Sequence, residues 1–405
     1  MLLAGCSGDE PSPSGPGGSA GRAGEGGGRD DGGSLVDRAA GGGGVAGGIS
    51  DARDGASGDG SLDATSSNDA EVGVRDVATD VMTEAPVTRP PPLAKLSATG
   101  LFSGLNTDGT LRLVTGVMPF EPKYALWSDA AQKTRWVFLP AGKKIDTSDP
   151  DHWSFPVGTK FWKEFAISGK RVETRLIERF GPGPDDYVYA AYWWKPNDAG
   201  TAADAELADP YVGVPLANGT THDIPKQEHC GTCHDPLKEH ILGFGALELN
   251  HTLPGVTVTS LAQGAWLSQP LPSNLEFPGP DAKTRDALGY LHANCGNCHN
   301  TTPGVYMIPE PRMDLRALIG QSLDQTGAYK TALNTLVTKY EHRSTPPIIT
   351  YRVAGGDTSR SCVSFRMAEL GAMDRMPPIA TKVVDTQGIA TVNAWIATLP
   401  SPPDR

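Results

Sequence analysis

The sequence predicts a multidomain chain with a disordered N-terminal tether, a β-sandwich-like domain and a mostly α-helical C-terminal region. Three observations indicate this division. Residues 7–92 contain 21 glycines and no aromatic residue, and 16 of the chain's 28 aromatic residues lie between Phe120 and Trp194. Apolar residues at helical spacing become clear only after residue 283. We therefore divide the chain into residues 1–92, 93–222, 223–282 and 283–405.

The N-terminal segment has the composition of a tether. Residues 7–92 carry 15 acidic and 6 basic residues, which accounts for −9 of the formal net charge of −12. Such a segment buries too little apolar surface to fold, and a Gly-rich coil of this length spans about 50 Å. The rest of the chain, at −3, has no basic cluster that indicates nucleic-acid binding. It also has no apolar run long enough for a transmembrane helix.

The first residues resemble a bacterial lipobox. Leu3-Ala4-Gly5-Cys6 places a cysteine after small and apolar residues, and in a lipobox that cysteine is lipidated after signal cleavage. The basic and long apolar regions of a signal peptide are absent here, so we expect translation to start upstream. Acyl chains bind a membrane through buried methylene groups. The alternative is that Cys6 is an ordinary thiol in a disordered tail.

Residues 93–222 predict a β-rich domain. Short runs rich in aromatic and β-branched residues are separated by Pro and Gly. Ser168-Gly169-Lys170 is expected to form a hairpin turn, and four to seven strands favour a sandwich or a barrel-like sheet. The predicted strands are residues 134–139, 159–167, 171–177 and 186–194.

Two functional alternatives exist for this domain. Its aromatic residues either form the core, which is the more common role, or provide a platform for sugar binding. Asp129, Asp149 and Asp151 either bind a cation or lie in solvated loops.

Two copies of one short motif dominate the C-terminal half. Cys230-Gly-Thr-Cys233-His234 and Cys295-Gly-Asn-Cys298-His299 both have the form Cys-x-x-Cys-His, the attachment signature of c-type haem. The two thiols add to the haem vinyl groups, and the histidine becomes an iron ligand. With six Cys and nine His in the chain, chance predicts only about 0.002 such motifs. A structural zinc held by the four cysteines is the alternative.

The residues around the second motif predict a helical domain. A helix is expected to run into Cys295, with Leu288 and Leu291 on one face and Gly289 allowing another helix to cross closely. The expected partner is a last helix over residues 386–398, whose apolar face contains Ile389, Val392 and Ile396, with Trp395 at the crossing. Residues 283–405 resemble a class I cytochrome c domain in this arrangement.

The resemblance extends to a methionine loop. Met376-Pro377-Pro378 lies shortly before the last predicted helix, as the sixth-ligand loop of class I cytochromes c does. The prolines restrict the backbone. The resemblance implies that the Met376 thioether and His299 ligate the same iron.

A wider resemblance covers about three quarters of the chain. From residue 96 onward the sequence is similar to exported bacterial dihaem c-type cytochromes with an N-terminal β region. The resemblance implies two covalently bound haem c groups and electron exchange with redox protein partners. The β region's matches imply no chemistry of their own. The stretches that match are the two haem motifs, Met376-Pro-Pro, and residues 96–102, 124–129, 133–136, 155–159 and 173–175.

The sixth ligand of the first iron stays open at this point. Possible ligands are His240, His251, His292, Met307, Met313 and Met367, or the position has no protein ligand. The choice matters because axial ligands shift haem potentials over about 0.8 V. Cys362 belongs to neither motif, and a buried free thiol is its simplest interpretation, with a reactive or cross-linking thiol as the alternative.

The sequence favours electron transfer as the function. A relay needs two six-coordinate irons. The alternative is a dihaem peroxidase or oxidase with one open iron and an acid–base group beside it. In a third hypothesis the β domain binds a ligand or substrate and the haems carry electrons from it. Both the Cys6 lipobox and c-type haem attachment predict export to the periplasm or cell surface, with a lipid anchor in the outer membrane.

Overall fold

The computed structural model describes residues 88–196, 202–208, 212–215, 220–302, 312–337, 349–370 and 375–403. All of them belong to one compact unit, Asp80–Arg405. The predicted tether lies outside the described residues except for residues 88–92, and Cys6 lies outside them as well, so disorder and lipidation stay predictions. No helix within the described ranges is long and apolar enough to cross a membrane.

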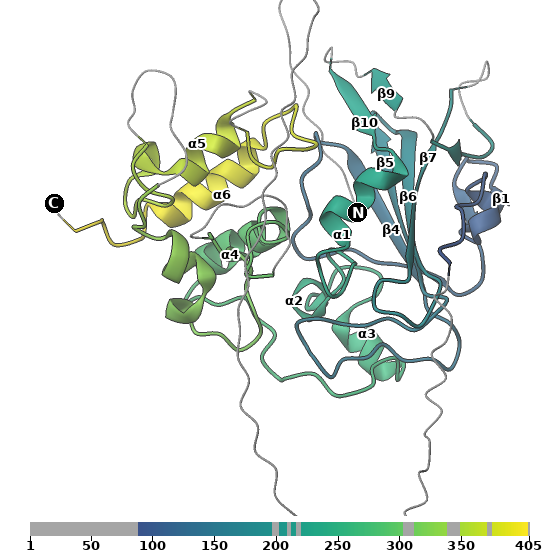
Figure 1. Ribbon diagram of the computed structural model, residues 1–405, viewed down its shortest axis with the longest axis horizontal. Coiled ribbons are helices and arrows are strands. Elements are labelled where there is room, and N and C mark those ends of the chain that lie inside the picture. The colour runs from purple at the N-terminus through teal and green to yellow at the C-terminus, as the bar shows by residue number, and fades with distance from the viewer. Residues whose placement is uncertain are drawn as a thin grey trace, which may run out of the picture. The chain divides into compact units, whose positions relative to one another are not determined.

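A six-stranded antiparallel sheet forms the larger, sheet-rich part of this unit (Figure 1). Its strands follow one another in chain order, so each is paired with its sequence neighbour. The ends of four of them lie within two residues of the ends of the four predicted strands, which confirms that prediction. The strands are β3 (Val117–Pro119), β4 (Gln132–Phe138), β5 (Lys160–Ile167), β6 (Lys170–Arg179), β7 (Tyr187–Trp193) and β8 (Glu206–Leu207).

The β5–β6 hairpin turns where the sequence predicts. Ile167 pairs with Lys170, which leaves a two-residue loop. Ser168 and Gly169 have φ values of 49° and 76°. Positive φ at both loop residues matches the twist of the flanking strands, and glycine adopts it without strain.

The sheet has an apolar layer on each face. One face places Val137, Phe161 and Tyr189 in a core with residues of the 241–275 region. The other face packs Trp136 and Trp162 beneath the hairpin of β1 (Phe102–Leu105) and β2 (Leu111–Leu113). The predicted sandwich is therefore present only in part. Within the described residues the layers over the sheet are two two-stranded pairs and short helices, because the strand-forming runs continue as one meander.

Residues 223–282 join the sheet rather than forming a separate domain. After the pair of β9 (Val212–Pro215) and β10 (Thr221–Ile224), the chain enters α1 (Gln227–His234), α2 (Ala246–Leu249) and α3 (Val258–Gln263). Phe244 packs edge-on against Phe120, with ring centroids 4.8 Å apart. The sequence shows no helical periodicity before the first motif, yet α1 contains the whole motif. It begins two residues after Pro225, which precedes the N-cap Lys226 and so removes no hydrogen bond from the helix.

The smaller part is helical. It contains α4 (Ala282–Asn294), α5 (Cys362–Ala368) and α6 (Thr386–Ile396), which group together in Figure 1, and the short turns Leu323–Gln325, Ala328–Ala332 and Thr358–Arg360. As the sequence predicts, α4 contacts α6. Leu288, Leu291, Val392, Trp395 and Ile396 are all buried in the shared core.

The glycine at this helix crossing differs from the prediction. A Cβ on Gly289 would meet the ring of Tyr124, which belongs to the sheet-rich part. The close approach between α4 and α6 instead occurs at Gly388, where a Cβ would meet the Tyr290 ring. The expected role of Gly289 is therefore wrong, because a bulky loop residue occupies the space that it leaves.

Candidate functional site

The first motif lies on α1, against strand β7 (Figure 1). The imidazole of His234 lies over Tyr189, with ring centroids 5.4 Å apart. Its Nδ1 lies 2.6 Å from the backbone oxygen of His240. A carbonyl can only accept, so Nδ1 carries the proton and Nε2 keeps its lone pair. This is the tautomer that an Nε2 metal ligand requires.

Burial keeps His234 neutral. Loss of hydration lowers the pKa of its imidazole to about 4, although the bond to His240 opposes this shift. The positive charges of Arg175 and Lys163 lower the pKa further. A neutral imidazole is the form that binds a metal, so this part of the chain fits an axial histidine.

The four motif cysteines are partly exposed free thiols. Burial raises the pKa of Cys230 and Cys298 to about 11 and that of Cys295 to about 12. Within the described ranges, no three His, Cys, Asp or Glu side chains gather as a metal ion held by several protein ligands would need. A c-type haem makes no such demand, because thioethers hold the porphyrin and one imidazole holds the iron.

The two motifs are close in space. Burial raises the pKa of the Cys298 thiol, and the charge of Cys233 raises it further. Cys233 of the first motif and Cys298 of the second therefore lie close enough to interact electrostatically. Cys230 packs against the core of the sheet-rich part, and Cys295 packs against the core of the helical part. The two motifs therefore lie where the two parts meet.

The second motif begins where α4 ends. Cys295 caps the helix, and the N–H of His299 donates to the Cys295 oxygen at 2.7 Å. Leu315 N–H donates to the His299 oxygen at 2.8 Å. Burial lowers the pKa of His299 to about 4, helped by Arg366 and Arg352. Its Nδ1 is buried without a hydrogen-bond partner among the described residues.

Met376 and the second histidine both interact with Arg366. Met376 is half-buried, and its N–H donates to the backbone oxygen of Arg366 at 2.9 Å. The side chain of Arg366 acts electrostatically on His299. The Met376 loop and the second motif thus flank the same residue.

The sheet-rich part holds the loop that follows Met376. Asp129 N–H donates to the Ala380 oxygen at 3.1 Å, and Asp129 Oδ1 accepts from Val383 N–H at 2.9 Å. Trp127 Nε1 donates to the Val383 oxygen at 2.9 Å. Asp129, one of three possible cation ligands, thus binds backbone, as does Asp151, which accepts from Ile319 N–H at 2.8 Å. Asp149 accepts from Asp151 N–H at 3.1 Å.

The histidines considered for the first iron have their ring nitrogens engaged. His251 and His292 each accept a backbone N–H at Nδ1, from Leu253 and Ala317. Their Nε2 atoms contact Glu121 O at 2.7 Å and Glu248 Oε1 at 2.9 Å. In His240, Nδ1 lies 3.1 Å from the Tyr189 hydroxyl and Nε2 lies 3.4 Å from Asp185 Oδ1.

The methionine candidates differ in location. Met367 is buried in the core of the helical part, and Met313 packs against that same core. Met307 lies outside the described residues. The thiol of Cys362 is buried, in agreement with its simplest interpretation.

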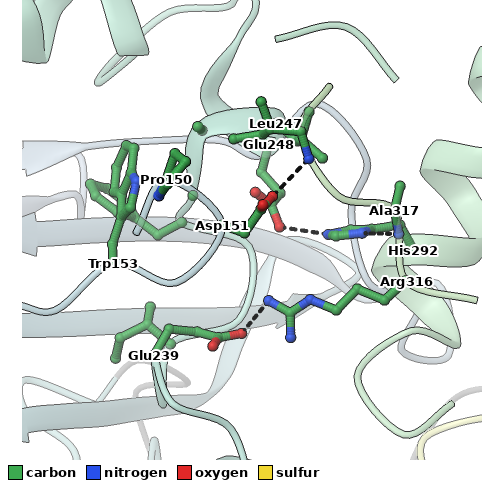
Figure 2. A pocket seen from close by; sticks show the side chains of 14 residues that line it. Pro150, Asp151, Trp153, Glu239, Leu247, Glu248, His292, Arg316 and Ala317 are labelled. Atoms are coloured by element: carbon green, nitrogen blue, oxygen red, sulfur yellow. Dashed lines mark hydrogen bonds and ion pairs between the residues drawn. The ribbon is translucent and has the colours of Figure 1, made fainter. Parts of the chain in front are cut away.

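A small cavity, shown in Figure 2, lies between the two parts. Its volume is about 20 Å³, enough for a water molecule and far too small for a haem. Arg316 pairs with Glu239 at 2.5 Å, and His292 pairs with Glu248 at 2.9 Å. These buried pairs tie the helical part to the sheet-rich part.

The sequence reasoning missed a row of cations on the sheet. Arg135, Lys163 and Arg175 are direct cross-strand partners on β4, β5 and β6, so their side chains share one face. Arg175 and Lys163 act electrostatically on His234, which places the row beside the first motif. Each of the three strands has a cationic residue at a position that alternates with core residues. That these three residues are neighbours becomes apparent only once the strand register is known.

The chain was compared with protein-family models, curated proteins and solved structures, and none of them matches it. The residues and their geometry are therefore the basis for assigning a function.

Proposed function

We propose that this chain is an exported dihaem c-type cytochrome that transfers electrons between redox protein partners. One haem is attached to Cys230 and Cys233 with His234 as axial ligand. The other is attached to Cys295 and Cys298, with His299 and Met376 as axial ligands. We also propose that Cys6 is lipidated and anchors the chain to the outer membrane, so that the protein works in the periplasm or at the cell surface.

The observation that carries the proposal is the repeated Cys-x-x-Cys-His motif. The tautomer of His234, which is that of an Nε2 iron ligand, supports it. The crossing of α4 and α6 beside the second motif supports a class I cytochrome c-like arrangement of residues 283–405. A bound haem would supply reversible one-electron chemistry at its iron.

The chain's own residues would orient and shield these groups. His240 fixes the ring of His234 through its carbonyl, and Tyr189 covers one side of that ring. The nearness of Cys233 and Cys298 supports two haems that exchange electrons rapidly. Charge on one haem then shifts the potential of the other, more strongly in a low-dielectric interior.

An intact-mass measurement tests the cofactor. The protein is produced in a host competent for c-type maturation, and noncovalent haem is removed with acid and acetone. We expect a mass that exceeds the polypeptide by two haems. A polypeptide without haem, or with stoichiometric zinc instead, would overturn the proposal.

A second candidate function is a dihaem peroxidase or oxidase. It is favoured by the engaged ring nitrogens of His240, His251 and His292, which leave the first iron without a histidine ligand from this set. Carbon monoxide binding to the reduced protein separates the two functions. A relay with six-coordinate irons should bind it slowly or not at all, whereas rapid binding at one haem per molecule, together with turnover of peroxide, would favour the enzyme.

A further inference from the structure

We propose that Arg135 and Lys163 bind the two propionate groups of the first haem on the face of the sheet. This inference rests on the proposed function, because it assigns a binding role toward a haem attached at Cys230 and Cys233. It identifies two residues that lie outside the Cys-x-x-Cys-His motifs, more than sixty positions before the attachment site in the sequence.

Three cations side by side on a sheet repel one another unless anions balance their charges. Like charges directly opposite one another on a sheet destabilise it, and burying an unpaired charge costs several kcal/mol. Arg135 is only 5% exposed. Lys163 lies beside Phe165, with its Nζ 5.1 Å from the ring centroid. Burial and the charges of Arg135, Arg175 and Lys133 hold the pKa of Lys163 well below its usual value.

Only one member of the row has an anionic partner. Arg175 forms a two-pronged pair with Glu173, through contacts of 2.6 and 3.1 Å. Glu173 also binds His222 Nε2 at 2.7 Å, and it attracts Lys163 without an ion pair between them. Among the described residues, neither the Arg135 nor the Lys163 side chain has a carboxylate within ion-pair distance, although Glu121 attracts Arg135 from further away. Two cations therefore remain for two propionates.

The position of the row fits the shape of the cofactor. Arg175 lies near the motif thiols, because the charges of Cys230 and Cys233 act on its guanidinium. Lys163 acts on His234, and Arg135 lies one strand further on. Two strand spacings place Arg135 about 10 Å from Arg175, which is comparable to the width of a porphyrin. A haem fixed by its thioethers near Arg175 would extend its opposite, propionate-bearing edge toward Lys163 and Arg135.

The test uses the full-length protein with both haems attached. The variants are Arg135→Gln, Lys163→Gln and the double variant. Lys170→Gln is the control, because it removes the same charge from an exposed position at the hairpin turn. A positive charge beside a haem favours the ferrous state, which carries one positive charge less. We therefore expect each test variant, in a potentiometric titration, to lower the potential of one couple and the double variant to lower it further.

Met376→His identifies which couple belongs to which haem. It should shift only the second haem, so the variants of the cation row must shift the other couple. The propionate bending mode in the resonance Raman spectrum should change in the same variants. Lys163→Arg keeps the charge and should retain the wild-type potential. If Arg135→Gln does not fold, Lys163→Gln decides the question.

The outcomes separate this inference from the proposed function. A wild-type mass without haem overturns both. Two haems with unchanged couples in Lys163→Gln, or with equal shifts of both couples, overturn only the propionate assignment. The alternative is that the two cations bind a free anion. In that case inorganic phosphate, added at constant ionic strength, would raise the melting temperature of the wild type but not of Lys163→Gln. That result would also overturn the assignment to propionates.

Discussion

His234 has its protonation state set by a residue six positions further along the chain. His240 has φ of 55°, a left-handed conformation that is uncommon outside glycine. Its backbone oxygen binds His234, and its side chain contacts Tyr189. Single residues around the first motif thus act through backbone geometry as well as through side-chain chemistry.

Met376→His should lower the potential of one haem by roughly a hundred millivolts, given the range that axial ligands produce. Imidazole stabilises the ferric state more than a thioether does. The absorption band that reports Met-to-iron ligation should disappear for half of the haem, as measured by titration and visible spectroscopy. If both couples keep their potentials, Met376 is only a packing residue.

Glu239→Gln tests the buried pairs beside the cavity. Burial alone would raise the pKa of Glu239, but His152 and Arg316 outweigh it and lower the pKa to about 2. Because this folded-state pKa lies below the unfolded value, the carboxylate stabilises the protein above about pH 4.3, and that stability is lost as the pH falls to 2. The shift corresponds to about 3 kcal/mol.

We expect Glu239→Gln to lower the free energy of unfolding at pH 7 by about 3 kcal/mol, because Arg316 is left buried without its partner. Stability should also vary less between pH 5 and 2 than in the wild type, as measured by denaturant titration at several pH values. Glu206→Gln is the control, since its pairs with Lys95 and Lys195 are exposed and contribute little. An equal loss in both variants would contradict the role of burial.

The crossing of α4 and α6 is the main contact between elements of the helical part. Tyr290 on α4 lies over Gly388 on α6, and its hydroxyl donates to Asp385 Oδ2 at 2.9 Å. Asp385 also caps α6, because its Oδ1 accepts from Gly388 N–H at 2.8 Å. One side chain therefore joins the start of the last helix to the helix that precedes the second motif.

Gly388→Ala should destabilise the protein by about 1–3 kcal/mol, because the added Cβ has no room beside the Tyr290 ring. Helix propensity by itself predicts the opposite sign, with a gain of about 1 kcal/mol. The measurement is a double-mutant cycle with Tyr290→Leu, in which the cost of Gly388→Ala should shrink. Ala390→Gly, at an exposed position of the same helix, measures propensity alone. A stabilising Gly388→Ala would refute the close contact.

At the scale of the whole molecule, the sheet-rich and helical parts contact one another near the two Cys-x-x-Cys-His motifs. Asn294, at the end of α4, accepts from Trp127 N–H at 2.7 Å, and Lys382 pairs with Asp223 at 2.6 Å. The first bond connects the β region to α4, and the second, together with the Asp129 contacts, connects it to the segment after Met376. If the two proposed haems are attached, we expect the β region to position them relative to one another.

Deleting residues 10–87 should leave both haem spectra and the melting temperature unchanged, because that segment has the composition of a chain that forms no core. A deletion that extends through residue 99 should instead cost about 3 kcal/mol or more. It removes Leu96, which is fully buried, and Thr99, which accepts from Trp162 Nε1 at 3.0 Å. Thermal unfolding monitored by circular dichroism compares the two. A large loss in the shorter deletion would show that residues 10–87 dock on the folded unit.

The sequence by itself determined the local features of this protein. The two Cys-x-x-Cys-His motifs, the strands β4 to β7, the turn at Ser168-Gly169 and the apolar face of α6 were all readable without a structure. Each depends on residues that are neighbours in the chain, where spacing and backbone preference fix the outcome.

Only the tertiary structure decided which distant residues meet. In the structure, Tyr124 packs against Gly289, and the close contact between α4 and α6 lies at Gly388. The ring nitrogens of His240, His251 and His292 contact other protein groups. The tertiary structure also aligned Arg135, Lys163 and Arg175 through strand register. Shifting one of these strands by one residue would turn its cationic side chain to the other face of the sheet. The row therefore depends on how whole strands pair and pack, which no local sequence pattern specifies.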